Sequence, residues 1–126
     1  MSKGRVLIVD DEADVRKSVR LIIAKAGYDV DEAEDPESGA TLVKSGANRT
    51  PLSAIITDLN MPKINEIIVI PYLHSQFPSC PIIVLSGSKM MDRSAKLFKE
   101  ANVQFLAKPI DQEQLLGAIK RVVKEG

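Results

Sequence analysis

The stretch Ala54–Pro62, which reads AIITDLNMP, decides the fold of this chain of 126 residues. It begins with an apolar, β-branched run of the kind found in strands that are covered on both faces of a parallel sheet. Asp58 ends that run, and a loop containing a proline follows. Arg5–Val9 (RVLIV) is a second run of this kind, and it ends at Asp10 and Asp11. If the two runs are neighbouring parallel strands, three carboxylates meet at one edge of the sheet.

Short strand-like runs alternate with longer amphipathic runs along the rest of the chain. The second and last strand-like runs are the more polar ones, as expected of strands at the edges of a sheet. Strands are predicted at Arg5–Val9, Tyr28–Asp31, Ala54–Thr57, Ile82–Leu85 and Val103–Ala107. Helices are predicted from about Ala13 to Ala26, from Pro36 to Ser45, over Ile64–Gln76, over Met91–Ala101, and after Asp111 with the apolar stripe Leu115, Leu116, Ile119, Val122 and Val123.

Several helix ends are marked by residues with strong capping preferences. Gly27 suits the position that stops the first helix. Asp35 and Asp111 are N-cap residues, and Pro36 has the fixed backbone angle that suits a first helical position. The third helix is irregular, because Pro71 cannot donate a backbone hydrogen bond and costs about 3 kcal/mol inside a helix. We therefore expect a kink, or a start delayed until near Pro71.

This alternation predicts a single domain over residues 1–126 with a (βα)5 α/β fold. The expected sheet is doubly wound and parallel, with five strands in the flavodoxin-like order 2-1-3-4-5. In that order the carboxyl ends of the first and third strands lie side by side at the topological switch point, where ligands bind. The polar residues that follow the strands at this edge are Asp10, Asp11, Asp58, Ser86 and Lys108.

The composition excludes several classes of protein. Lys+Arg and Asp+Glu number 17 each, so the chain has no electrostatic basis for attracting nucleic acid or a membrane surface. Hydrophobic residues make up 44% of the chain, but no apolar run reaches the ~20 residues that span a bilayer. The single cysteine, Cys80, excludes an internal disulfide, favours a reducing, cytoplasmic setting, and is expected to be an inert buried thiol. His74 alone makes no zinc site and is expected on a helix surface.

Three clustered carboxylates require a cation. Two like charges ~4 Å apart repel by ~4 kcal/mol at an effective dielectric constant of ~20. Since Mg²⁺ prefers oxygen ligands, we predict a site for Mg²⁺ (or Mn²⁺) formed by Asp10, Asp11, Asp58 and the backbone carbonyl of Asn60. The alternative for Asp10 and Asp11 is that they only cap the helix that begins near Ala13.

Ser86 and Lys108 are best explained by a second anion. A phosphoryl group on Asp58 would offer its oxygens to the metal, to the lysine and to the serine hydroxyl. The metal and the lysine would also neutralise the repulsion between the carboxylate and the incoming phosphoryl group. Without such a group, Lys108 would form a plain salt bridge, and surface salt bridges contribute little to stability.

Four motifs carry a resemblance to a known family: Val9–Glu12 (VDDE), Asp58–Pro62 (DLNMP), Ser86–Gly87 (SG) and Phe105–Pro109 (FLAKP). In this order and at these spacings, over essentially the whole chain, they resemble the receiver domains of two-component response regulators, the CheY-like superfamily. The resemblance implies that Asp58 accepts phosphate from a sensor histidine kinase, a phosphotransfer protein or a small phosphodonor. It also implies that Ser86 and Phe105 form the switch and that the bond between Lys108 and Pro109 is cis.

The resemblance further implies a signalling module that catalyses only its own phosphorylation and dephosphorylation. The helix over Met91–Ala101, the strand Val103–Ala107 and the last helix would form a face that controls an output domain or a target protein, or supports a phosphorylation-dependent homodimer. No direct contact of this domain with nucleic acid or a membrane is expected. Asn60 and Ser88 are expected to tune the lifetime of the phosphoryl group by controlling water access.

Three positions depart from the family pattern. Glu66 stands where a glycine is common, Gly87 stands where alanine is usual, and Pro71 is not expected in the third helix. None of them is a predicted site residue, so the chemistry expected of the site is unchanged. The resemblance therefore does not extend to the local backbone around Glu66 and Pro71 or to a partner that docks there.

Three other functions are compatible with parts of the pattern. A degenerate receiver that serves only as an interaction scaffold is disfavoured by the intact set of site residues. A small phosphohydrolase with an aspartyl nucleophile, of the haloacid-dehalogenase type, would need a second aspartate where this chain has Asn60. A flavodoxin-like cofactor binder would need hydroxyls, glycines and backbone amides after the first strand, where this chain has Asp-Asp-Glu.

Overall fold

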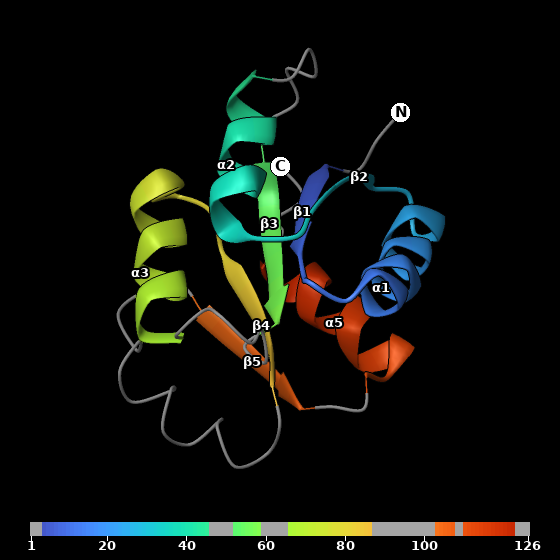
Figure 1. Cartoon of the computed structure of the whole chain (residues 1–126). Coiled ribbons are helices and arrows are strands. Elements are labelled where there is room, and N and C mark those ends of the chain that lie inside the picture. The colour runs from blue at the N-terminus through green and yellow to red at the C-terminus, as the bar shows by residue number, and fades with distance from the viewer. Residues whose placement is uncertain (1–3, 46–51, 59–65, 87–102, 108–109, 123–126) are drawn as a thin grey trace.

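Five parallel strands form one sheet in the order β2-β1-β3-β4-β5, with helices on both of its faces (Figure 1). The computed structural model describes residues 4–45, 52–58, 66–86, 103–107 and 110–122. Its strands are β1 (Arg5–Val9), β2 (Asp29–Ala33), β3 (Leu52–Asp58), β4 (Ile82–Ser86) and β5 (Val103–Ala107). Its helices are α1 (Ala13–Lys25), α2 (Pro36–Ser45), α3 (Glu66–Gln76) and α5 (Gln112–Val122). The predicted fold class and strand order are confirmed, while the helix predicted over Met91–Ala101 lies outside the described residues.

Alternate residues of the central strands face two separate hydrophobic clusters. Helices α1 and α5 cover one face of the sheet, and α2 and α3 cover the other (Figure 1). Val6 and Ile8 of β1 belong to the cluster under α1 and α5, whereas Leu7 and Val9 belong to the cluster on the α3 side. All residues of β1 are buried. This double burial explains why the strand reads as a continuous apolar run rather than as an alternating one.

The capping residues act as their types predict. The backbone N–H of Ser38 donates to Asp35 Oδ1 over 2.7 Å at the start of α2, and that of Glu113 donates to Asp111 Oδ1 over 2.8 Å at the start of α5. Gly27 follows α1 with a φ of 105°, a left-handed backbone conformation that residues with a Cβ rarely adopt. These helix ends are therefore fixed by local sequence.

Helix α3 does not have the delayed start that was expected near Pro71. It begins at Glu66 and continues through Pro71 to Gln76, so of the two expected outcomes the delayed start is excluded and the kink stays a prediction. The missing backbone donor costs about 3 kcal/mol. However, Val69, Ile70 and Leu73 are at most 2% exposed, and burying each such side chain contributes about 1.5–3 kcal/mol. Packing against the sheet therefore outweighs the defect.

Strand β2 is shifted relative to its prediction, from Tyr28–Asp31 to Asp29–Ala33. Its limits follow from pairing, because Arg5 to Val9 of β1 are matched residue for residue by Asp29 to Ala33. Tyr28 instead packs into the cluster under α1 and α5. The first residue of β1, Arg5, is 3% exposed and its Nε donates to Asp31 Oδ2 over 2.6 Å. An ion pair thus ties the two strands together at the end opposite Asp10.

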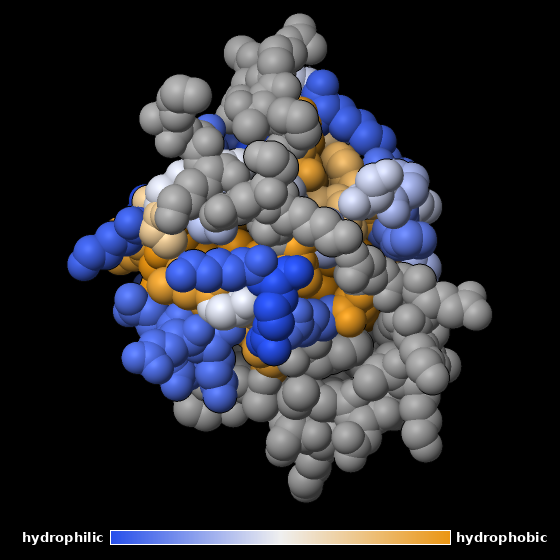
Figure 2. Space-filling model, turned by 180° about the vertical axis from the view of Figure 1, so that it is seen from behind, coloured by the Kyte–Doolittle hydropathy of each residue, from blue (hydrophilic) through white to orange (hydrophobic). Residues whose placement is uncertain are grey.

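The outer surface mixes hydrophilic and apolar side chains. Seen from behind, hydrophilic side chains lie beside and over apolar ones (Figure 2). Leu21 and Leu42 are the large hydrophobic residues that are exposed among those described, at 51% and 40%. His74, predicted on a helix surface, is half-buried in the last turn of α3. Within the described ranges, no helix combines the length and the apolar character needed to cross a membrane.

Two helical glycines offer a matched test of packing. A Cβ added at Gly117 of α5 would meet no atom within 4 Å, whereas one added at Gly39 of α2 would lie 3.1 Å from Leu7 Cδ2. Alanine in a helix interior is favoured over glycine by ~0.5–1 kcal/mol. We expect Gly117→Ala to raise the free energy of unfolding by about that amount and Gly39→Ala to gain less or to lose stability. Urea unfolding of both variants measures this, and a larger gain for Gly39→Ala would contradict the packing described here.

Cys80, predicted to be an inert buried thiol, is 6% exposed. Burial raises the pKa of its thiol from 9.0 to about 12. Below pH 9 the thiol is protonated in both the folded and the unfolded chain, whereas between pH 9 and pH 12 it ionises in the unfolded chain only. The unfolded state then binds fewer protons, so this group lowers the free energy of unfolding as pH rises, by up to ~1.4 kcal/mol per pH unit.

The test is the pH dependence of unfolding above pH 9 in the wild type and in Cys80→Ala. We expect the wild type to lose stability more steeply, because other groups titrate equally in both proteins. Modification by a thiol reagent at pH 8 should likewise be slow in the native wild type and fast in urea. Equal pH slopes, or rapid modification of the folded chain, would show that the thiol is accessible.

Candidate functional site

Two aspartates lie at the carboxyl ends of neighbouring strands, at the switch point of the sheet. Val9 of β1 is in register with Thr57 of β3, so Asp10 and Asp58 each come one position after this pair. Asp10 is 2% exposed and Asp58 is 1% exposed, while Asp11 is exposed. Asp58 is the last residue of β3 rather than the first residue after it. The predicted edge therefore holds two buried carboxylates from adjacent strands and an exposed third.

Asp10 is held by main-chain contacts on several sides. Its backbone N–H donates to the carbonyl of Ala33 over 3.0 Å, which extends the pairing of β1 with β2 by one residue. Its Oδ1 accepts the backbone N–H of Glu12 over 2.9 Å. Glu12 occupies the N-cap position of α1 and makes no side-chain capping bond. One oxygen of Asp10 thus serves the turn that leads into the helix, but Glu12 and not Asp10 or Asp11 occupies the N-cap, so the capping alternative for these two acids is not confirmed.

The donor chemistry of this edge fits a hard divalent cation. Mg²⁺ is usually bound by one or two carboxylates, with waters and other oxygens completing the octahedron. Asp10 and Asp58 supply two buried carboxylates from adjacent strands. Within the described ranges, no group of three or more His, Cys, Asp or Glu side chains is arranged to hold a metal ion. The fit therefore rests on the two buried acids, and a contribution from Asp11 stays a prediction.

The other predicted site residues are placed only in part. Ser86 is the last residue of β4 and pairs with Ala107, which directly precedes Lys108 in the sequence. Phe105 lies within β5 and pairs with Val84. The side chains of Ser86 and Phe105 are not among those described, and Asn60, Ser88, Lys108 and Pro109 lie outside the described residues. Backbone pairing thus brings β4 and β5 to the same edge as Asp58.

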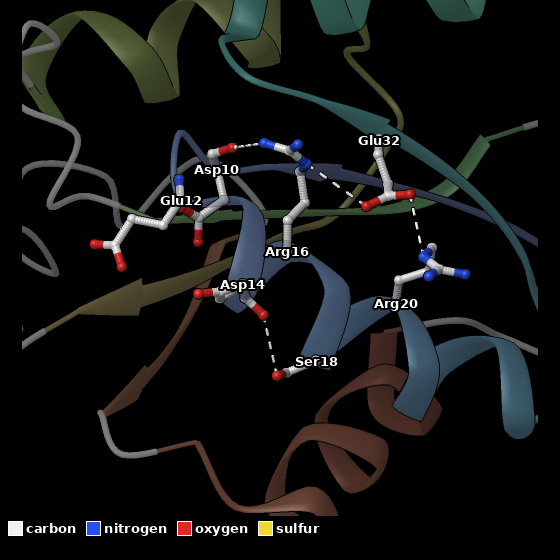
Figure 3. A network of polar contacts seen from close by, with 7 residues as sticks. All are labelled: Asp10, Glu12, Asp14, Arg16, Ser18, Arg20 and Glu32. Atoms are coloured by element: carbon white, nitrogen blue, oxygen red, sulfur yellow. Dashed lines mark hydrogen bonds and ion pairs between the residues drawn. The ribbon is translucent and has the colours of Figure 1, made fainter.

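Sequence reasoning missed a charged network beside Asp10 (Figure 3). Arg16 Nη1 donates to the carbonyl oxygen of Asp10 over 2.7 Å. Arg16 Nε lies 3.5 Å from Glu32 Oε1, and Arg20 Nε lies 3.2 Å from Glu32 Oε2. The spacing of Arg16 and Arg20 places them on one helix face. No local signal, however, connects that face to an acid in β2 or to a carbonyl in the preceding loop.

The strand order and the helices on both faces define a flavodoxin-like α/β protein with its ligand edge at the β1–β3 switch point. Residues 6–120 match the family model described as the response regulator receiver domain. The chain belongs to this family, as its motifs predicted. Receiver domains of response regulators are signalling domains rather than classical enzymes.

Individual relatives agree with this assignment. The transcriptional regulatory protein PrrA of Mycobacterium tuberculosis is 33% identical over 98% of this chain and 52% of its own length. The DNA-binding transcriptional regulator NtrC of Escherichia coli K12 is 23% identical over 98% of this chain and 25% of its own length. The crystal structure of a receiver domain protein from Clostridium thermocellum has a TM-score of 0.81 at 23% identity and covers 95% of this chain and 94% of its own. The chain thus spans between a quarter and about half of these two curated relatives.

Proposed function

We propose that this chain is a phosphorylation-switched receiver domain in which Asp58 accepts the phosphoryl group. The observation that carries the proposal is the burial of Asp58 beside Asp10 at the carboxyl ends of adjacent parallel strands, in a chain of the receiver family. A carboxylate at the tip of β3 is fixed by the sheet on one side and faces the ligand edge on the other. It is therefore preorganised for attack on a phosphorus atom.

In the proposed reaction, a carboxylate oxygen of Asp58 attacks the phosphorus of a phosphohistidine or of a small acyl phosphate. A new O–P bond forms while the P–N bond to the histidine, or the P–O bond to the acyl group, breaks. The leaving group takes the bonding electrons, and the histidine then takes a proton from water. The product is an aspartyl phosphate, whose hydrolysis by water returns the carboxylate.

Response regulator receiver domains generally bind Mg²⁺ for phosphorylation. Here Asp10, Asp11, Asp58 and the backbone carbonyl of Asn60 would hold Mg²⁺ (or Mn²⁺). When bound, the cation offsets the negative charge that gathers between the carboxylate and the phosphoryl oxygens. Asp10 would contribute with an orientation already set by its contacts to Glu12 and Ala33.

The remaining predicted residues would read the phosphoryl group out. Lys108 and Ser86 would bind its oxygens, Ser86 and Phe105 would move together as the switch, and Asn60 and Ser88 would govern water access. The changed surface would include β5 and α5, with a sensor histidine kinase or a phosphotransfer protein upstream and an output domain or a target protein downstream. We assign this role to one domain over residues 1–126 and place it in the cytoplasm, with a phosphorylation-dependent homodimer as one form of output.

A second role would be that of a scaffold that no longer accepts phosphate. The burial of two acids at the switch point argues against it, because removing a carboxylate from water costs free energy and a scaffold gives no reason to retain two of them there. The same experiment separates the two roles.

We expect wild-type protein incubated with acetyl phosphate and Mg²⁺ to gain the mass of one phosphoryl group, and Asp58→Ala to gain none. Intact-mass spectrometry under denaturing conditions provides the measurement. Asp14→Asn is the matched control, since Asp14 is an exposed carboxylate in the first turn of α1 and its adduct should equal that of the wild type. No adduct on the wild type would leave the scaffold role, and an adduct on Asp58→Ala would place the acceptor elsewhere.

Thermal unfolding tests the metal separately from phosphorylation. A cation that binds only the native state at ten times its Kd adds about 1.4 kcal/mol, and 1 kcal/mol shifts the Tm of a domain of this size by roughly 3–5 °C. We therefore expect Mg²⁺ to raise the Tm of the wild type by several degrees and that of Asp10→Asn by much less. NaCl at matched ionic strength controls for screening. The same shift in both proteins would show that Asp10 does not bind the metal.

A further inference from the structure

Arg16 reaches from the first turns of α1 back to the edge of the sheet (Figure 3). Its Nη1 donates to the carbonyl oxygen of Asp10 over 2.7 Å, and its side chain is 16% exposed. We infer that Arg16, held in turn by Glu32, is a positioning residue that fixes the loop of Asp10 and Asp11 in the geometry that binds Mg²⁺. This inference rests on the proposed function and adds a residue that acts on the same site without touching the cation.

The carbonyl of Asp10 lies at a discontinuity of the backbone. It comes after Val9↔Ala33, where the register of β1 with β2 ends, and before the first hydrogen bond of α1, which joins Arg16 N–H to the carbonyl of Glu12 over 3.0 Å. A guanidinium N–H is a charged donor, so its bond to a carbonyl is stronger than one from a neutral group. The contact therefore fixes the peptide plane between the two predicted metal ligands, Asp10 and Asp11.

Glu32 links the contact between Arg16 and the Asp10 carbonyl to the neighbouring strand β2. It lies in β2, and its two carboxylate oxygens face Arg16 and Arg20, at 3.5 Å and 3.2 Å from their Nε atoms. Arg16 is thereby placed between an acid that attracts its charge without accepting a hydrogen bond from Nε and a carbonyl oxygen that accepts a hydrogen bond from Nη1. Arg20 is more exposed, at 37%, and contacts Glu32 without bonding to Asp10. The two arginines share one partner but differ in their relation to the loop.

Removing Arg16 would change the affinity for Mg²⁺ in opposite directions, depending on whether Arg16 acts through its charge or by positioning the loop. A guanidinium charge close to the site repels a divalent cation, so the loss of charge alone would tighten Mg²⁺ binding. The loss of a residue that orients a metal ligand typically weakens metal affinity by about 10–100-fold. The direction of the change in Kd therefore separates the two roles.

The experiment is isothermal titration of Mg²⁺ into the whole chain, with circular dichroism to show that each variant is folded. We expect Arg16→Gln to raise the Kd for Mg²⁺ about tenfold. Arg20→Gln also removes a positive charge that contacts Glu32, and we expect it to leave the Kd nearly unchanged. Arg16→Lys should recover part of the loss, because an ammonium still donates to the Asp10 carbonyl. At saturating Mg²⁺, the rate of phosphorylation of Arg16→Gln by acetyl phosphate should approach that of the wild type, since Arg16 does not touch the phosphoryl group.

Several results would overturn the inference. These are an unchanged or lower Kd in Arg16→Gln, an equal loss in Arg20→Gln, or a weaker affinity in Arg16→Lys than in Arg16→Gln. In each of these cases the wild type still binds Mg²⁺, so the proposed metal site stands. A wild-type chain that gives no binding heat and no rise in Tm with Mg²⁺ would instead refute the metal site and this inference together.

Discussion

Parallel pairing of β1 with both of its neighbours is the constraint on which this fold depends. β1 pairs with β2 on one side and with β3 on the other, and a parallel neighbour can be reached only through a crossover. Helices α1 and α2 lie in the two crossovers that place β2 and β3 on opposite sides of β1. Because each crossover returns the chain to the same end of the sheet, the carboxyl ends of all strands form one edge. Asp10 and Asp58, which are distant in the sequence, become neighbours for this reason.

The burial of Asp10 and Asp58 carries a cost in free energy at the carboxyl edge of the sheet. Removing a carboxylate from water costs several kcal/mol unless charges and donors replace the lost solvent. The backbone N–H of Glu12 provides one such donor to Asp10. Apolar residues at the ends of β1 and β3 would have continued the two clusters at no such cost. The proposed function gives both acids a role that folding alone does not require.

The sequence predicted the features that are decided within a few residues. The apolar runs of the strands, the stop at Gly27 and the caps at Asp35 and Asp111 depend on neighbours in the chain, and the structure confirms them. Local signals were not sufficient where distant packing decides. The start of α3 is independent of Pro71 because its buried side chains hold the helix against the sheet. The contact of Arg16 with Asp10 could not be inferred, since it requires the distance between a helix and a loop.

The same contacts separate this site from the phosphate cradles of other proteins with this strand order. A cradle binds an anion through backbone N–H groups that the fold leaves available after the first strand. Here the N–H of Asp10 is bonded to Ala33, and that of Glu12 to the Asp10 carboxylate. Both of these backbone N–H groups are already bonded within the protein. The exposed side chain of this loop next to Asp10 is the carboxylate of Asp11. In the proposed function, a bound cation would offset the negative charge of this edge and so allow a phosphoryl group to approach it.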